Sequence, residues 1–128
     1  MNPKSKNQGK STKYFGYLGE NFAISLLERN GYKVIDRNFR CFVGEIDLVA
    51  IDETETPSTL VFVEVKTRKS RQFGEPEEAV GSIRLSRLKK AGEYYLNLHP
   101  KLPKKQRIDV VSIMVKGNKI DAKIIKVF

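Results

Sequence analysis

The chain has 128 residues, enough for one domain, and it contains no apolar run near the roughly 18 residues that a membrane-spanning helix needs, which argues against a membrane protein. Its single cysteine excludes an intrachain disulfide and favours the cytoplasm, and its single histidine argues against zinc sites and histidine-based catalytic triads. Twenty-four Lys and Arg against fifteen Asp and Glu give a formal charge of +9, which favours a polyanionic partner such as nucleic acid.

The first predicted helix covers about residues 14–30, where apolar residues recur at helical spacing and Gly31 follows as a stop signal. Residues 1–13 are polar and basic and show no periodicity. We therefore expect a disordered tail over 1–13 and a single domain over 14–128.

Five strands and a second helix follow, so the predicted order is αβββαββ. Because the central segments are apolar on both faces, we expect an α/β fold with a mixed central sheet and a helix on each side. In chain order, we expect strands at 33–40, 43–51 and 60–68, a helix at 77–98, and strands at 107–115 and 119–127.

Two carboxylates lie in the otherwise apolar strand predicted over 43–51. Since strand side chains alternate between faces, Glu45 and Asp47 are expected on one face. Ile46, Leu48 and Ala50 are expected on the other. A carboxylate is rarely buried without a cation or hydrogen bonds, because losing its hydration costs several kcal/mol or more.

Glu64 and Lys66 share one face of the next predicted strand, which has the apolar pattern of a central strand. If the two strands are neighbours, Asp47 and Glu64 converge on one cation with Lys66 beside it. Carboxylate oxygens and water form the ligand shell that Mg²⁺ or Mn²⁺ prefers. The alternative is a solvated pair of Glu64 and Lys66 without chemistry.

A fourth carboxylate, Glu20, lies on the apolar side of the first predicted helix, in line with Gly16 and Ala23. It either leans toward the sheet, or it is a border residue whose carboxylate reaches solvent or a glutamate paired with a nearby lysine. The sequence leaves both interpretations open.

Basic residues follow the proposed cation site directly. Arg68, Lys69 and Arg71 come just after Lys66, so a basic loop is expected to leave the sheet there. Such side chains bind phosphates, and the affinity they give falls steeply as salt rises. We expect these three residues to contact DNA.

The second predicted helix adds further cations. Arg84 lies on the apolar stripe of this helix, where a charge is unexpected. Arg87, Lys90 and Tyr94 form a flanking basic and aromatic strip suited to phosphate contacts. We expect the three cations to bind nucleic acid, and the alternative is an ordinary solvated helix face.

Several strings together resemble the bacterial YraN-like family over about residues 14–115. They are Gly19-Glu20, Gly31-Tyr32, Arg37-Asn38-Phe39-Arg40, Gly44-Glu45-Ile46-Asp47-Leu48, Phe62-Val63-Glu64-Val65-Lys66, Gly74 with Pro76-Glu77-Glu78-Ala79-Val80, and Asp109-Val110-Val111. The resemblance implies a restriction-endonuclease-like fold of the PD-(D/E)xK type, similar to archaeal Holliday-junction resolvases. Ile46 replaces a motif proline and Ile108 a usual phenylalanine, and neither change alters the expected fold.

By this resemblance, Asp47 is the first motif aspartate, and Glu64 and Lys66 are the acidic and basic members of the E-x-K motif. Glu20 takes the acidic position of the first helix, and Glu45 or Glu20 is a candidate for a second ion or for orienting water. Asp47, Glu64 and Glu20 are therefore the expected ligands of Mg²⁺ or Mn²⁺.

The expected function is a metal-dependent endonuclease that hydrolyses DNA phosphodiester bonds, and the resemblance extends the expected substrates to branched DNA and suggests a homodimer by analogy. The first alternative is a noncatalytic nucleic-acid-binding module that keeps the same carboxylates as a structural ion-pair network. The second is a protein-interaction domain whose basic face meets an acidic partner.

Overall fold

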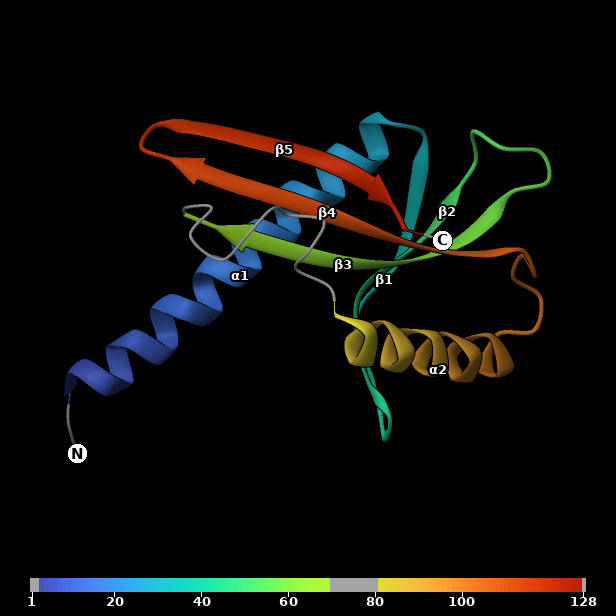
Figure 1. Cartoon of the computed structure of the whole chain (residues 1–128), viewed down its shortest axis with the longest axis horizontal. Helices are drawn as coiled ribbons and strands as arrows, with labels where there is room; N and C mark the ends of the chain where they lie inside the picture. The colour runs from blue at the N-terminus through green and yellow to red at the C-terminus, as the bar shows by residue number, and fades with distance from the viewer. Residues whose placement is uncertain (1–2, 70–80, 128) are drawn as a thin grey trace.

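A five-stranded sheet with the strand order β1-β2-β3-β4-β5 forms the centre of the computed structural model, which describes residues 3–69 and 81–127 (Figure 1). Strands β3 and β4 are parallel, and the other neighbours are antiparallel. The elements are α1 Pro3–Arg29, β1 Tyr32–Cys41, β2 Gly44–Asp52, β3 Thr59–Arg68, α2 Ser82–Leu98, β4 Gln106–Lys116 and β5 Lys119–Lys126.

This arrangement confirms the predicted mixed α/β fold, with a helix on each face of the sheet. Parallel strands cannot be joined by a tight turn, so α2 forms the crossover between β3 and β4. The predicted β4–β5 hairpin is also confirmed, and Gly117 supplies its positive φ of 56°.

Two apolar cores lie on opposite faces of the sheet. β3 contributes to both, which explains why its sequence is apolar on both faces. The core on the α1 side is formed by Ala23, Leu27, Tyr32, Leu48, Ala50, Val61, Val63, Val111 and Ile113. The core on the α2 side is formed by Ile46, Val49, Leu60, Phe62, Leu88, Ala91, Tyr95 and Ile108.

Helix α1 begins at Pro3 rather than near residue 14, so the predicted start of this helix is wrong. The prediction relied on apolar periodicity, which only the packed part of a helix needs. Once that part has formed, each added turn extends an existing nucleus at little cost. The N-terminal half of α1 projects away from the sheet (Figure 1), and Pro3 suits a first helical position.

The expectation that Ile46 shares a face with Leu48 and Ala50 is also wrong. Ile46 packs in the core beside α2, whereas Leu48 and Ala50 pack beside α1. Asn38 lies on β1 between the partners of Leu48 and Ile46, and its φ of 55° interrupts the strand alternation. The outer part of the β1–β2 hairpin therefore packs against α2.

Helix α2 begins at Ser82, and the earlier residues of the helix predicted over 77–98 lie outside the described ones, apart from Gly81 at its N-cap position. Within the described part of the chain, neither helix has the length and apolarity needed to cross a bilayer.

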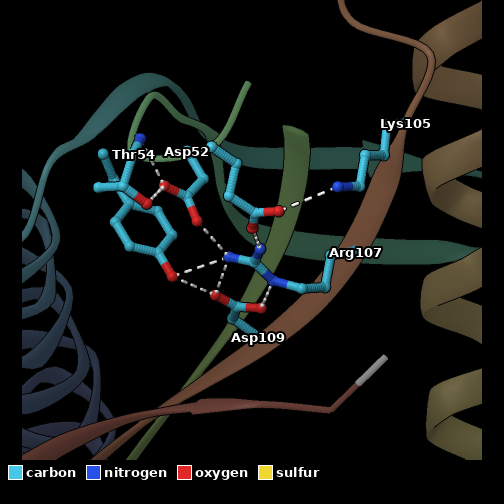
Figure 2. Close-up of polar contacts among 7 residues, drawn as sticks. Asp52, Thr54, Lys105, Arg107 and Asp109 are labelled. Atoms are coloured by element: carbon cyan, nitrogen blue, oxygen red, sulfur yellow. Dashed lines mark hydrogen bonds and ion pairs between the residues drawn. The ribbon is translucent and has the colours of Figure 1, made fainter. Parts of the chain in front are cut away.

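A buried ionic network joins the end of β2 to the start of β4 on the α1 side (Figure 2). We call it the Arg107 cluster, and it comprises Tyr32, Asp52, Thr54, Glu55, Lys105, Arg107 and Asp109. The Arg107 guanidinium donates to Asp109 Oδ1 at 2.7 Å and to Asp52 Oδ2 at 2.8 Å. It also donates to the Tyr32 hydroxyl at 2.8 Å.

Candidate active site

Asp47 lies at the point where β2 separates from β3. The β2–β3 pairing ends at Leu48 and Val63. Beyond it, the Val65 N–H donates to Asp47 Oδ2 at 2.8 Å, so the side chain takes the place of a backbone carbonyl as the acceptor. The carboxylate is thus fixed at the opening between the two strands. The predicted convergence of Asp47 and Glu64 is conditional on these strands being neighbours, and the structure meets that condition.

Glu64 lies next to this opening on the α2 side of β3, and only 1% of its side chain is exposed. Its Oε1 is bound by the Arg84 guanidinium, with Nε at 2.8 Å and Nη2 at 2.5 Å. Lys66 Nζ lies 3.3 Å from the same oxygen. Glu64 Oε2 is buried and has no hydrogen-bond partner among the described residues. Such an atom calls for a ligand, because an unsatisfied buried acceptor costs free energy.

The surroundings of the Asp47 carboxyl disfavour its ionised form. Burial, followed by the negative charge of Glu64, raises its pKa from the ordinary 3.8 to about 7, although the Val65 hydrogen bond acts in the opposite direction. Two carboxylates that repel each other in a partly buried place favour either a proton or a cation between them. We call Asp47, Glu64, Lys66 and Arg84 the Glu64 cluster.

The unexpected charge of Arg84 on the apolar stripe of α2 is explained by Glu64, which this arginine reaches across the sheet face. Burial alone would lower the Arg84 pKa, but the hydrogen bond to Glu64 and the charges of Glu64, Asp47 and Glu45 raise it. Arg84 therefore neutralises the site, a role that sequence reasoning missed when it treated this residue only as a phosphate contact.

Glu20 leans toward the sheet, as one of the two interpretations predicted, and it also has a cationic partner. Its Oε1 accepts hydrogen bonds from Arg37 Nε at 3.2 Å and from Asn38 Nδ2 at 3.3 Å. The partner is an arginine of β1 and not a lysine. Glu20 still contributes to the raised pKa of Asp47, so it lies near the site without being directed into it.

Glu45 is half exposed and pairs with Arg40 at 3.2 Å. It lines a pocket of about 480 Å³ between the β1–β2 hairpin and α2, together with Arg84 and Arg87. Its charge acts on Arg84, but no direct contact joins it to Asp47 or Glu64 in the described part of the structure.

The remaining predicted cations are spread over two elements. Arg68 ends β3, and Lys69 follows it with its ammonium 5.3 Å from the centre of the Phe15 ring. Arg87 and Lys90 are exposed on α2. Arg71 lies outside the described residues.

The donor set of the Glu64 cluster fits a hard divalent cation. Asp47 and Glu64 offer carboxylate oxygens, one of which is buried and has no partner among the described residues. Mg²⁺ commonly uses one or two carboxylates and completes its shell with water and phosphate. Among residues 3–69 and 81–127, no group of three or more His, Cys, Asp or Glu is placed to hold a metal. Glu20 as a third ligand remains a prediction.

Residues 19–113 match the family model described as "Uncharacterised protein family UPF0102". A UPF0102 protein of Caldicellulosiruptor bescii is 43% identical over 106 residues, which cover 82% of this chain and 86% of the relative. A UPF0102 protein of Syntrophomonas wolfei is 45% identical over 104 residues, which cover 81% and 87%. These matches confirm the resemblance to the YraN-like family. The chain belongs to the UPF0102 family.

Proposed function

We propose that the protein is a metal-dependent endonuclease that hydrolyses DNA phosphodiester bonds. The observation that carries the proposal is Glu64 Oε2, a buried carboxylate oxygen that has no partner among residues 3–69 and 81–127, next to a second carboxyl, Asp47, whose pKa is raised to about 7. Strongly shifted pKa values and unsatisfied buried groups are concentrated at functional sites.

Asp47 and Glu64 would hold Mg²⁺ or Mn²⁺ through their carboxylate oxygens. When bound, such an ion supplies Lewis-acid chemistry, since it polarises a phosphoryl oxygen and lowers the pKa of water. Lys66, whose ammonium lies 3.3 Å from Glu64, would stabilise negative charge that develops on the phosphate. Glu20 and Glu45 would orient water or a second ion from the edge of the site.

The formal charge of +9 supports a nucleic-acid substrate. Arg87 and Lys90 on α2 and Lys69 after β3 are candidate phosphate contacts, together with Arg68 and Arg71. Binding should weaken steeply between about 50 and 200 mM salt, because each phosphate contact releases counterions. Affinity that stays constant over this range would contradict the electrostatic account.

A noncatalytic nucleic-acid-binding module is the second candidate, and one observation favours it. Arg84 and Lys66 both contact Glu64 Oε1, so the charge of Glu64 is neutralised without a metal. In that case the cluster is a structural ion-pair network, and the protein binds DNA but leaves it intact.

Cleavage assays separate the two candidates. Purified protein is incubated with linear, branched and single-stranded DNA, with Mg²⁺, with Mn²⁺ and with EDTA. We expect metal-dependent cleavage that Asp47→Ala and Glu64→Ala each reduce by roughly 100-fold or more. Glu28→Gln, which changes an exposed carboxylate of α1, is the matched control and should retain full activity.

A contaminating nuclease would survive both substitutions, so equal activity in all preparations would contradict the proposal. DNA binding without cleavage, combined with no Mn²⁺ binding in paramagnetic titrations, would establish the noncatalytic module. Mn²⁺ binding that disappears in Asp47→Ala supports the metal site independently of any substrate.

A further inference from the structure

Phe42 is the most exposed large apolar side chain recorded in the described part of the structure, with 86% of its surface accessible. It lies in the turn of the β1–β2 hairpin, which extends past α2 at the edge of the molecule (Figure 1). A single exposed apolar side chain is ordinary, so what distinguishes Phe42 is the aromatic surface that it forms with Tyr94.

The Phe42 ring is held in place although it is exposed. It packs edge-to-face against Tyr94 of α2, with ring centres 5.5 Å apart and an interplanar angle of 88°. Phe39 links the pair to the core, since it lies 6.3 Å from Tyr94 and 4.9 Å from the buried Tyr95 ring. A ring that is already ordered loses little conformational entropy when a ligand stacks on it.

Exposed cations lie on the same two elements as this aromatic surface. Arg40, whose side chain is 79% exposed and pairs with Glu45, precedes Phe42 by two residues, and Arg87 and Lys90 are exposed on α2. The hairpin packs directly against α2, because a methyl group added to Gly44 would lie 3.8 Å from Arg87 Cβ. Aromatic rings next to a positively charged groove are the pattern with which proteins bind single-stranded nucleic acid.

The pocket of about 480 Å³ lies between the hairpin and α2 and shares Arg84 with the Glu64 cluster. It is lined by Gly44 of the hairpin, by Arg87 and by Arg84, whose guanidinium binds Glu64. A DNA strand whose phosphates contact Arg87 and enter the pocket would therefore approach the two carboxylates while a nucleotide further along it reaches Phe42.

We infer that Phe42, backed by Tyr94, stacks on an unpaired base of the bound strand, so that the substrate class is DNA with unpaired nucleotides beside the cleavage position. The inference rests on the proposed function for the cleavage step, but stacking itself requires neither metal nor cleavage. A ring stacks readily on an unpaired base, whereas both faces of each internal base in a continuous duplex are covered by its neighbours and unstacking them costs a few kcal/mol.

The charges disfavour a second copy of this chain as the occupant. A twofold interface repeats the same surface on both subunits, so Arg40, Arg87 and Lys90 would face their own like charges around the apolar centre. A polyanion satisfies the same cations.

Tryptophan fluorescence offers a direct test, because the chain contains no tryptophan. Phe42→Trp places a single reporter at the turn, and Ile120→Trp places the matched control on β5, where Ile120 is 54% exposed. In EDTA, we expect single-stranded DNA to quench the Phe42→Trp emission and to leave the Ile120→Trp emission unchanged. A duplex of the same sequence should quench neither.

Affinity measurements with Phe42→Ala complete the test. We expect binding of single-stranded DNA to weaken by about 5- to 150-fold, the range for loss of one stacking aromatic, and duplex binding to remain within about twofold. Equal losses on both substrates, no loss on either, or an unaltered protein that does not bind single strands would overturn the inference. So would a dimer in sedimentation experiments that dissociates in Phe42→Ala.

The stacking site and the proposed cleavage activity can each fail without the other. Quenching and selective affinity loss without any cleavage would keep the stacking site and favour the noncatalytic module. Metal-dependent cleavage that Phe42→Ala leaves unchanged on both substrates would keep the enzyme and overturn the stacking site.

Discussion

Within the described part of the chain, two buried clusters of charged side chains lie on opposite faces of the sheet, and they differ in how completely their polar atoms are satisfied. In the Arg107 cluster, the guanidinium contacts Asp109, Asp52, Glu55 and the Tyr32 hydroxyl, and that hydroxyl donates to Asp109 at 2.6 Å (Figure 2). In the Glu64 cluster, one carboxylate oxygen has no partner in the part of the chain that the structure describes. A completed network stabilises a structure, whereas an incomplete one can bind a ligand.

Their carboxyl groups respond in opposite ways. Burial acts to raise the pKa of Asp52, but hydrogen bonds from Thr54 and Arg107 outweigh it and lower this pKa to about 2. Burial and the charge of Glu64 raise the pKa of Asp47 to about 7. Asp52 therefore stays ionised as part of the fold. A divalent cation would reduce the repulsion between the Asp47 and Glu64 carboxylates.

The largest effect on stability is expected from Arg107→Met. Removing the central cation leaves two buried carboxylates, Asp52 and Asp109, without their partner, which costs about 3–5 kcal/mol of unfolding free energy. Urea denaturation measures the loss, and Lys101→Met, at an exposed cation, is the control with little expected change. A loss near zero would show that the Arg107 cluster does not stabilise the fold.

The second prediction concerns pH without metal. Because the folded-state pKa of Asp47 is raised, the folded protein binds more protons than the unfolded one between about pH 4 and 7, so stability falls as pH rises through this window. The asparagine side chain of Asp47→Asn cannot ionise. The free energy of unfolding of this variant should therefore exceed that of the unaltered protein by about 2–4 kcal/mol near pH 8, and the difference should disappear near pH 4.

Denaturation in EDTA at several pH values tests this prediction, and millimolar Mn²⁺ should reduce the difference near pH 8 by stabilising only the unaltered protein. Equal stabilities throughout the range would mean that Asp47 is not under the predicted repulsion.

Gly92→Ala is expected to disturb the Glu64 cluster and to leave the Arg107 cluster unchanged. A methyl group at Gly92 of α2 would lie 2.4 Å from the ring of the buried Phe62, so α2 must shift, at a cost of about 1–3 kcal/mol. Since α2 carries Arg84, Mn²⁺ binding should change as well, while the Arg107 cluster on the other face keeps its contacts.

The matched control is Gly16→Ala on α1, where an added methyl group meets no atom of residues 3–69 or 81–127 within 4 Å. Helix propensity alone should then raise stability by up to about 1 kcal/mol. Thermal unfolding distinguishes the two variants by the sign of the change, and a stabilised Gly92→Ala would contradict the close packing of α2 on the sheet.

The smallest effect is expected from Arg84→Met. Arg84 is 44% exposed and Lys66 remains beside Glu64, so the loss in EDTA should be only about 1 kcal/mol. The melting temperature should then rise more with Mn²⁺ than it does in the unaltered protein, because the ion replaces the missing cation. Arg40→Met, at a surface pair with Glu45, should show no such metal dependence.

Local patterns were sufficient to predict the fold and one side of the site. Alternation over residues 60–66 predicted a strand buried on both faces, and it placed Glu64 and Lys66 side by side, where their charged atoms lie 3.3 Å apart. The same pattern was present in β4, where Arg107 and Asp109 interrupt an apolar strand. That signal could have revealed the Arg107 cluster.

The sequence by itself thus determined the elements, their order and the strands that carry the carboxylates, because side-chain periodicity is a local property. Only the tertiary structure decided that Arg84 neutralises Glu64, that Arg37 pairs with Glu20, and that the Phe42 ring packs against the Tyr94 ring. These pairs join different elements far apart in the chain. Their contacts depend on strand separation and helix placement, which no local pattern encodes.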